Sequence, residues 1–314
     1  MAQITIQKAA IKLLKQNINL RKHEKVVVVT DRKNCPIFKA VCDAVKLMKG
    51  NLTEIYITKN RTHSSPLPKL EKTFIQNDVI IAITDKSISH CPETGIARKK
   101  YGVRVISMVE VDKNLFLKAM RVNQKKIKII GNKLSKKLKK CKKVRIRTPS
   151  GTEIKVNVIK DAIDVDDGDS TTRGKLNNLP YGEVAMAPIN IVDGVVAIDF
   201  SRVNIKPEYH VKLILRKGKI IDYNNRKAKN FVEYLRKIDG EKALKVVELG
   251  LGTNPEHKSL VGKIIHDEKI IGSAHIAFGG FGNKRKCKIH EDVVLLKPTI
   301  FFDKKLVIKK GEIL

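Results

Sequence analysis

Short apolar runs alternate with amphipathic segments along the first half of the chain. Four runs rich in β-branched residues have the composition of strands buried inside a sheet. They cover residues 25–31, 52–58, 78–84 and 103–109. Between the first two runs, Ile37, Val41 and Val45 recur at helical spacing after Pro36, which suits the first turn of a helix. This alternation predicts a Rossmann-like α/β domain, a parallel sheet covered by helices on both faces.

The second half of the chain follows a different pattern, in which short strands are joined by turns. Residues 144–147 and 152–159 flank the turn sequence TPSG, which predicts a β-hairpin. Further strands are expected at 195–200 and 211–216, a helix at 227–238, and a hairpin that turns at Asp303-Lys304. We therefore expect two domains, a Rossmann-like α/β domain at 1–147 and a β-rich α+β domain at 148–314.

The turns that follow the expected strands lack a nucleotide-binding fingerprint. After Val29 the chain reads TDRKNCP, which matches neither the glycine-rich dinucleotide pattern nor a P-loop. The Rossmann-like pattern therefore carries no evidence for nucleotide binding.

The composition describes a globular protein with an unusual charge. Of the 314 residues, 64 are lysine or arginine and 32 are acidic, which gives a net charge of +32. Such a field attracts polyanions, so nucleic acid is one candidate partner. However, the basic residues are spread along the chain, aromatic residues make up only 5%, and no helix-turn-helix or zinc-finger spacing occurs. Nucleic acid is therefore not the favoured partner.

Membrane and secretion signals are missing from the sequence. No run approaches the roughly 18 apolar residues of a membrane span, and the N-terminal segment lacks the apolar core of a signal peptide. The five cysteines are odd in number and show no CxxC spacing, so neither a disulfide framework nor a zinc–thiolate site is expected. These features predict no membrane partner and a cytoplasmic location.

Five acidic and histidine residues lie beside apolar runs and glycine-rich turns in the second half of the chain. They are Glu183, Glu248, His275, His290 and Asp292. His290 and Asp292 are two residues apart, so an extended strand would project both side chains to one face. Imidazole and carboxylate groups are the ligands that a divalent metal takes where thiolates are absent. This set predicts a metal site.

Three segments around these residues carry a family resemblance. They are NLPYGEVAMAP, ELGLGTNPEHKSLVGKIIHDEKIIGSAHIAFG and the closing IHED. They resemble the leucyl aminopeptidase family typified by aminopeptidase T, a group of thermophilic-type metallopeptidases. Matched residue by residue, the resemblance implies metal ligands at Glu183, Glu248, His275, His290 and Asp292. It also implies a homodimer that removes N-terminal residues from short peptides, with 148–314 as the metal-binding catalytic domain.

In such a hydrolase, two divalent ions of zinc, cobalt or manganese would polarise a carbonyl and turn a bridging water into a nucleophile. One carboxylate would accept the proton of that water. Glu183 and Glu248 are the candidates for this role, and Glu248 is our choice as the catalytic residue. Glu268, in the sequence Asp267-Glu268-Lys269, is a third candidate, although an exposed charge in a turn is the simpler interpretation.

The chain departs from the peptidase pattern in three places. A tyrosine that follows the family's HIALG segment corresponds here to Phe281 and Gly282, so its hydroxyl is absent. The connection between His275 and His290 is shorter than in the family, and so is the whole chain. These differences weaken the case for peptide hydrolysis more than the case for metal binding.

A mononuclear iron(II) dioxygenase that cleaves an aromatic ring is the alternative interpretation. His275, His290 and Asp292 would form the face of two histidines and one carboxylate that holds Fe(II) in such enzymes. A relative of the peptidase family cleaves a hydroxylated pyridine ring in this way. A basic nucleic-acid-binding protein without catalysis is a second alternative.

Overall fold

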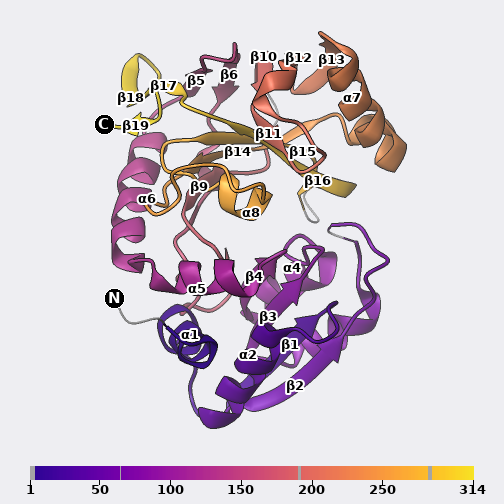
Figure 1. The fold of residues 1–314 in the computed structure, drawn as a ribbon, viewed down its shortest axis with the longest axis vertical. Coiled ribbons are helices and arrows are strands. Elements are labelled where there is room, and N and C mark those ends of the chain that lie inside the picture. Colours follow the sequence, from indigo (N-terminus) through magenta and orange to yellow (C-terminus); the bar gives the residue numbers. More distant parts are fainter. Residues whose placement is uncertain (1–3, 64, 190–191, 282–284) are drawn as a thin grey trace. The chain divides into compact units, whose positions relative to one another are not determined.

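The computed structural model describes residues 4–63, 65–189, 192–281 and 285–314. The chain divides into two compact units (Figure 1). Unit 1 comprises Met1–Gln124 and Asp166–Tyr181, and unit 2 comprises Lys125–Val165 and Gly182–Leu314. Within the described ranges, none of the helices combines the length and the apolar composition needed to cross a membrane.

Unit 1 is built on a five-stranded parallel sheet with the order β2-β1-β3-β4-β8. The strands are β1 Lys25–Thr30, β2 Asn51–Tyr56, β3 Val79–Thr84, β4 Arg104–Val109 and β8 Leu176–Asn178. The helices are α1 Ile6–Lys12, α2 Pro36–Leu47, α3 Glu71–Ile75, α4 Pro92–Tyr101 and α5 Lys113–Arg121, with a π-helical turn at Leu13–Ile18 and a 3₁₀ turn at Pro68–Leu70. The four strands predicted from the apolar runs, and the helix that starts at Pro36, are confirmed.

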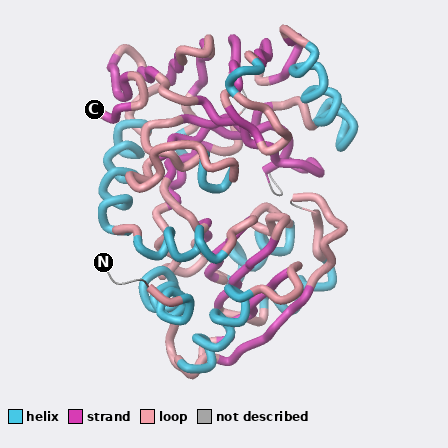
Figure 2. The backbone as a smooth tube through the Cα atoms, in the orientation of Figure 1, coloured by secondary structure: helices cyan, strands magenta, loops and turns pink. Residues whose placement is uncertain are grey.

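Helices cover the parallel sheet in two layers, which Figure 2 distinguishes by colour from the strands. Helices α1, α2 and α5 pack together, and α3 packs on α4. Val27 and Val29 of β1 belong to one hydrophobic cluster with Phe74 of α3 and Ala97 of α4, the helices of the second layer. Since side chains alternate along a strand, Val26 and Val28 point to the opposite face. All four valines are fully buried, which explains why these strands are continuously apolar.

Strand β8 joins the parallel sheet from the middle of the chain. It pairs in parallel with β4, from Val105 opposite Leu176 to Ser107 opposite Asn178. The first segment of unit 1 therefore ends at Gln124, and residues 166–181 form its second segment. This division differs from the single domain boundary that we expected near Arg147. A strand of three residues carries no periodic signal of its own, because its place is set by pairing with a distant strand.

Unit 2 contains two large antiparallel sheets, with the orders β13-β12-β10-β6-β5-β17-β18-β19 and β11-β16-β15-β14-β9-β7. The strands of the first are β5 Lys143–Arg147, β6 Glu153–Asn157, β10 Val192–Ile198, β12 Val211–Arg216, β13 Lys219–Tyr223, β17 Thr299–Phe302, β18 Lys305–Lys309 and β19 Glu312–Ile313. Those of the second are β7 Ile163–Asp166, β9 Glu183–Met186, β11 Phe200–Ser201, β14 Val246–Gly252, β15 Ala274–Phe281 and β16 Arg285–Leu295. The helices are α6 Gln124–Leu138, α7 Arg226–Asp239 and α8 Ile264–Asp267, with 3₁₀ turns at Lys160–Ala162, Pro207–Tyr209 and Gly240–Lys242.

One hydrophobic core joins both sheets of unit 2 to its helices. It includes Ile146 from the eight-stranded sheet, Ile276 from the six-stranded sheet and Phe231 from α7. The Phe231 ring meets the Phe278 ring edge to face, with centroids 6.0 Å apart. Each large buried side chain of this kind stabilises the fold by roughly 1.5–3 kcal/mol. This core gives the six-stranded sheet a fixed backbone on which polar side chains can be positioned.

Candidate metal centre

The five residues predicted as ligands lie on four neighbouring strands of the six-stranded sheet. Glu248 is on β14, His275 on β15, His290 and Asp292 on β16, and Glu183 at the start of β9. Ala277 of β15 lies opposite both Glu248 and Asp292, and Gly279 lies opposite His290. Paired residues of antiparallel strands project to the same face. The strand register therefore places these side chains on one face of the sheet, with small residues between them.

The structure brings all five of these side chains together. His275 Nε2 lies 3.3 Å from Glu183 Oε2 and 3.9 Å from Glu248 Oε1. His290 Nε2 lies 3.5 Å from Glu248 Oε2 and 3.4 Å from Asp292 Oδ1. Glu248 thus faces both imidazoles, one with each carboxylate oxygen. Their role as metal ligands remains a prediction.

Both histidines present the same ring nitrogen to the carboxylates. His290 Nδ1 lies 2.7 Å from the carbonyl oxygen of Gly280, and His275 Nδ1 lies 3.3 Å from that of Glu268. A carbonyl oxygen can only accept a hydrogen bond, so Nδ1 must be the protonated nitrogen. In the neutral ring the lone pair then sits on Nε2, which points into the cluster. Such outer hydrogen bonds are the usual way in which proteins orient metal-binding histidines.

Gly250 provides the space that the His275 ring occupies. Gly250 and His275 pair across β14 and β15. A Cβ atom at position 250 would lie 2.0 Å from His275 Cε1 and 2.2 Å from His275 Nε2. Real atoms do not approach so closely, so any other residue would displace the ring. The absence of a side chain at Gly250 is therefore part of the architecture of this centre.

Two further residues belong to the cluster, and the sequence interpretation missed their positions. Glu268 is buried, so the expectation of an exposed turn charge was wrong. It lies in the turn after α8, where its carbonyl receives the bond from His275 and its carboxylate pairs with Lys269. Lys269 is fully buried and donates to Glu183 Oε1 and Glu268 Oε1, both at 2.7 Å. The apolar spacing of the segment, HDEKIIG, gave no sign that this turn folds inward.

The cluster strongly perturbs its own ionisation. Burial alone would lower the pKa of His275, but a hydrogen bond to Glu248 and the charge of Glu183 raise it to about 9. For His290, burial is likewise outweighed by Asp292, and its pKa rises to about 10. Burial raises the pKa of Glu268 to about 7, although Lys269 opposes the shift. The pKa of Asp292 falls far below its usual range, because the His290 charge outweighs burial. The carboxylates of the cluster therefore stabilise positive charge on the imidazole rings of His275 and His290.

The donor set fits a divalent metal ion. Among the described residues, two groups have ligand atoms that all lie within 4.8 Å of one another. They are Glu183, Glu248 and His275, and Glu268, His275 and Asp292. Glu183 Oε2 is buried and accepts no hydrogen bond, which leaves a lone pair directed into the cluster. Nitrogen and oxygen ligands of this kind suit zinc, manganese or iron, and not a soft thiolate-binding ion.

The position of the peptidase tyrosine is only partly described. Phe281 ends β15, and its ring centroid lies 6.4 Å from that of His290. Gly282 lies outside the described residues. A phenyl ring has no hydroxyl group, so Phe281 cannot supply the hydroxyl of the peptidase tyrosine.

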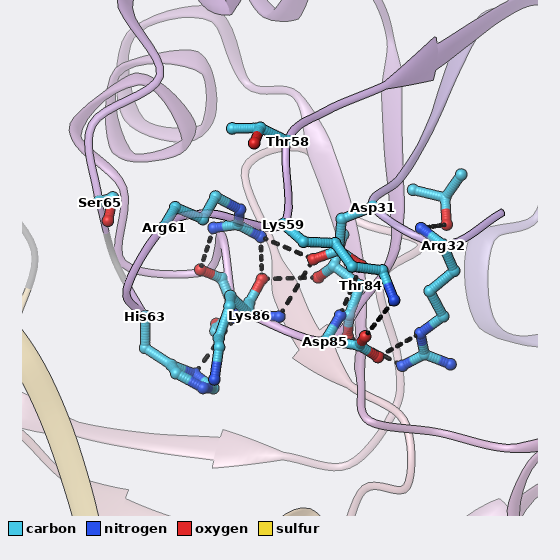
Figure 3. Close-up of polar contacts among 12 residues, drawn as sticks. Asp31, Arg32, Thr58, Lys59, Arg61, His63, Ser65, Thr84, Asp85 and Lys86 are labelled. Atoms are coloured by element: carbon cyan, nitrogen blue, oxygen red, sulfur yellow. Dashed lines mark hydrogen bonds and ion pairs between the residues drawn. The ribbon is translucent and has the colours of Figure 1, made fainter.

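A second polar cluster occupies the carboxyl ends of β1 and β3 in unit 1 (Figure 3). Such ends of parallel strands often bind ligands. Here, however, Asp31 accepts from the backbone N–H groups of Asp85 and Lys86 at 2.7 and 3.3 Å. The Arg61 guanidinium donates to the carbonyl groups of Lys86 and Ser87, and it lies 3.6 Å from Asp31 Oδ2. These bonds tie three loops together, so we interpret the cluster as structural.

A mixed α/β protein with a histidine–carboxylate centre is the class that this fold and site define. A family model described as NicX, 2,5-dihydroxypyridine 5,6-dioxygenase, matches residues 8–314. The chain therefore belongs to this family, and it is an enzyme. A sequence comparison with curated proteins finds no match.

Two solved structures share the fold. The 2,5-dihydroxypyridine dioxygenase of Pseudomonas putida is 15% identical and has a TM-score of 0.83, with 100% of this chain and 98% of that chain covered. Wild-type AmpT of Thermus thermophilus is also 15% identical and has a TM-score of 0.66, with 98% of each chain covered. At this identity the two likenesses concern the fold alone.

The family match corrects the principal interpretation of the sequence. The chain was assigned to the aminopeptidase T family and to a metallo-aminopeptidase function, and both assignments were wrong. The hydrolase and protease activities, and the removal of residues from short peptides, were part of the same assignment and are corrected with it. The physical reason is that a dioxygenase and AmpT both share this fold with the chain, so segments that build the sheet and its polar cluster can resemble a peptidase.

Proposed function

We propose that this protein is an iron(II)-dependent dioxygenase that cleaves a dihydroxylated pyridine ring. Two contacts carry the proposal: His290 Nε2 lies 3.4 Å from Asp292 Oδ1, and His275 and Asp292 have ligand atoms within 4.8 Å of each other. They occur in a chain that matches the dioxygenase family over residues 8–314. Two histidines and one carboxylate with open positions are the usual ligands of non-haem Fe(II) oxygenases. This was the alternative interpretation of the sequence.

In this proposal, His275 and His290 bind iron through Nε2, and Asp292 binds through a carboxylate oxygen. The hydrogen bonds from Nδ1 to the backbone carbonyls hold both rings in position before the metal arrives. Bound iron(II) would supply the redox chemistry that lets O₂ react with an electron-rich ring. By analogy with the family name, the ring bond between carbons 5 and 6 would break, and both oxygen atoms would enter the product.

Glu248 is our proposed proton acceptor. Its two carboxylate oxygens lie 3.9 and 3.5 Å from the Nε2 atoms of His275 and His290, so it stands beside the position of the metal. A carboxylate in this position can accept the proton of a ring hydroxyl as the substrate binds. Glu183 would remain outside the iron ligands. The homodimer stays a prediction, which sedimentation would test.

The decisive experiment is to incubate iron-loaded protein with 2,5-dihydroxypyridine and O₂. We expect the ring absorbance to disappear with uptake of one O₂ per ring, and no cleavage of leucyl dipeptides. Asp292→Asn should abolish the reaction, because it removes the anionic ligand. His210→Ala is the matched control, since His210 is exposed and directly precedes β12 of the eight-stranded sheet, whereas the candidate ligands lie on the six-stranded sheet. A wild-type protein that does not retain iron, or an Asp292→Asn variant with unchanged turnover, would refute the proposal.

A further inference from the structure

Unit 2 contains a cavity between helix α6 and the segment around β19 (Figure 1). Its volume is about 630 Å³, and its walls include none of the five candidate metal ligands. Pockets that bind small molecules usually measure roughly 300–1,000 Å³. The cavity is therefore large enough for a ligand of its own, separate from the metal centre.

The apolar part of the cavity wall is aliphatic. It is formed by Ile129, Ile130 and Leu134 of α6 together with Ile271 and Ile313. Leu134 is buried in the core, whereas Ile129 is 69% exposed, so the apolar wall extends from the core to the solvent. Among the described residues that line the cavity, none is aromatic. Such a wall suits an alkyl chain better than a flat ring, which gains from aromatic partners.

Three lysines line the same cavity. They are Lys133 and Lys137 of α6 and Lys310, and the one carboxylate beside them is that of the exposed Glu312. Within the described part of the chain, none of these lysines pairs with an acidic side chain. Lys137 Nζ instead donates to the main-chain oxygen of Leu314 at 2.7 Å. Lysine stems can lie along apolar surface while their charges stay in water.

The positive charges at this position crowd one another. Burial lowers the pKa of Lys137, and the charges of Lys133 and Lys305 lower it further. A bound anion would offset this repulsion. The local charge therefore favours a negatively charged group beside the aliphatic wall.

We propose that this cavity binds a single-chain aliphatic anion, such as a fatty acid. The alkyl chain would lie against the isoleucines and Leu134, and the anionic head group would lie among Lys133, Lys137 and Lys310. A lysine ammonium is a compact point charge, so it would recognise the head group by its charge. A second copy of this chain is a less suitable occupant, because it carries its own net charge of +32 towards these lysines. The inference does not depend on the proposed function.

The test is a calorimetric titration of the full-length protein with decanoate, below the concentration at which decanoate forms micelles. We expect saturable binding of one decanoate per chain. Octanoate, which is two methylenes shorter, should bind roughly 15-fold more weakly. Decanol has the same chain without the charge and should bind at least tenfold more weakly than decanoate.

Two variants test the position of the site. Lys133→Glu should weaken decanoate binding at least tenfold, because it reverses one charge beside the head group. Lys136→Glu is the matched control, since Lys136 is exposed on the same helix but does not line the cavity, and its affinity should stay within twofold of the wild type. If Lys133→Glu does not fold, Ile130→Trp fills the cavity without changing the charge and should also weaken binding at least tenfold.

Several results would overturn the inference. One is the absence of saturable binding to the wild type, and another is equal weakening in Lys133→Glu and Lys136→Glu, which would indicate attraction to the overall charge alone. Unchanged affinity in folded Ile130→Trp would exclude the cavity. Weaker binding in Asp292→Asn would place the carboxylate at the candidate metal centre instead. Sedimentation that shows a dimer broken by Ile129→Glu, without decanoate binding, would identify a second copy as the occupant. A protein that fails to cleave the ring would leave this inference intact.

Discussion

His290 and Asp292 stand two residues apart on β16, and His290 Nε2 lies 3.4 Å from Asp292 Oδ1. The strand projects both side chains to one face of the sheet. Glu291, between them, is buried on the other face and pairs with Arg202 at 2.7 Å. One extended segment thus provides two adjacent candidate metal ligands on one face of the sheet and an ion pair on the other face.

This pair leads to a prediction about stability. Metal that binds only the folded state should stabilise the protein by about 2.7 kcal/mol at a concentration 100 times its Kd. We expect Fe²⁺ or Mn²⁺ to raise the melting temperature of metal-free wild-type protein, and His290→Ala to abolish the rise. His210→Ala should behave like the wild type, because His210 is exposed. A metal-dependent rise that survives in His290→Ala would show that the ion binds elsewhere.

Gly250→Ala should damage the centre without touching a ligand. Its Cβ would lie 2.0 Å from His275 Cε1, so the ring must move. We expect a loss of stability of roughly 1–3 kcal/mol from overpacking and at least a tenfold weaker affinity for metal. Isothermal titration with Mn²⁺ measures the affinity, and urea unfolding measures the stability.

The control for this variant is Gly131→Ala. Gly131 lies in α6, and an added Cβ would meet the Val165 side chain at 2.8 Å and Thr253 Oγ1 at 4.0 Å. Metal affinity should stay at the wild-type value. Equal metal affinity in Gly250→Ala and the wild type would show that the His275 position does not matter for binding.

Asp31→Ala should destabilise unit 1. The change leaves the buried Arg61 without its carboxylate and two backbone N–H groups without their acceptor. Removing one partner of a buried ion pair typically costs about 3–5 kcal/mol, so we expect roughly 3 kcal/mol in urea unfolding. Asp43→Ala, at an exposed position of α2, should change the free energy of unfolding by less than about 0.5 kcal/mol.

Asp85 should contribute to acid sensitivity. Burial opposes its ionisation, but the bond from Lys59 and the charge of Arg32 outweigh burial and lower its pKa below 3.8. A carboxylate with a lowered folded-state pKa stabilises the fold above its unfolded-state pKa, and this stability is lost as pH falls through the folded-state pKa. Asp85→Asn should therefore flatten the decline in unfolding free energy below pH 3.8. An identical acid profile in both proteins would contradict this expectation.

The cysteines should differ in reactivity. Burial raises the pKa of Cys42 and Cys91 to about 12, and that of Cys141 and Cys287 to about 11. Because the thiolate is the reactive form, their alkylation at pH 8 should be at least about 100-fold slower than that of free cysteine. Cys35 is half-buried at the start of α2 and should be modified first by iodoacetamide, as mass spectrometry of the native protein would show. Early labelling of Cys91 would contradict the expected order.

Local sequence patterns were sufficient for most of the secondary structure and for the ligand types. The valine run that became β1, the hairpin of β5 and β6, and the strand β12 were predicted from short-range signals. The ligand candidates followed from residue chemistry beside strand ends, and the common projection of His290 and Asp292 followed from the two-residue period of a strand. These features depend on neighbours in sequence, which is why the sequence alone reveals them.

Tertiary structure decided what depends on distant contacts. The pairing of β8 with β4, the burial of Glu268 and Lys269, and the space that Gly250 leaves for His275 all arise between segments far apart in the chain. The motifs also could not decide the reaction class, because a dioxygenase and AmpT both share this fold. A ligand motif specifies which atoms can hold a metal. The surrounding charges and packing, such as the buried Lys269 beside Glu183 and the space at Gly250, are assembled only by the folded chain.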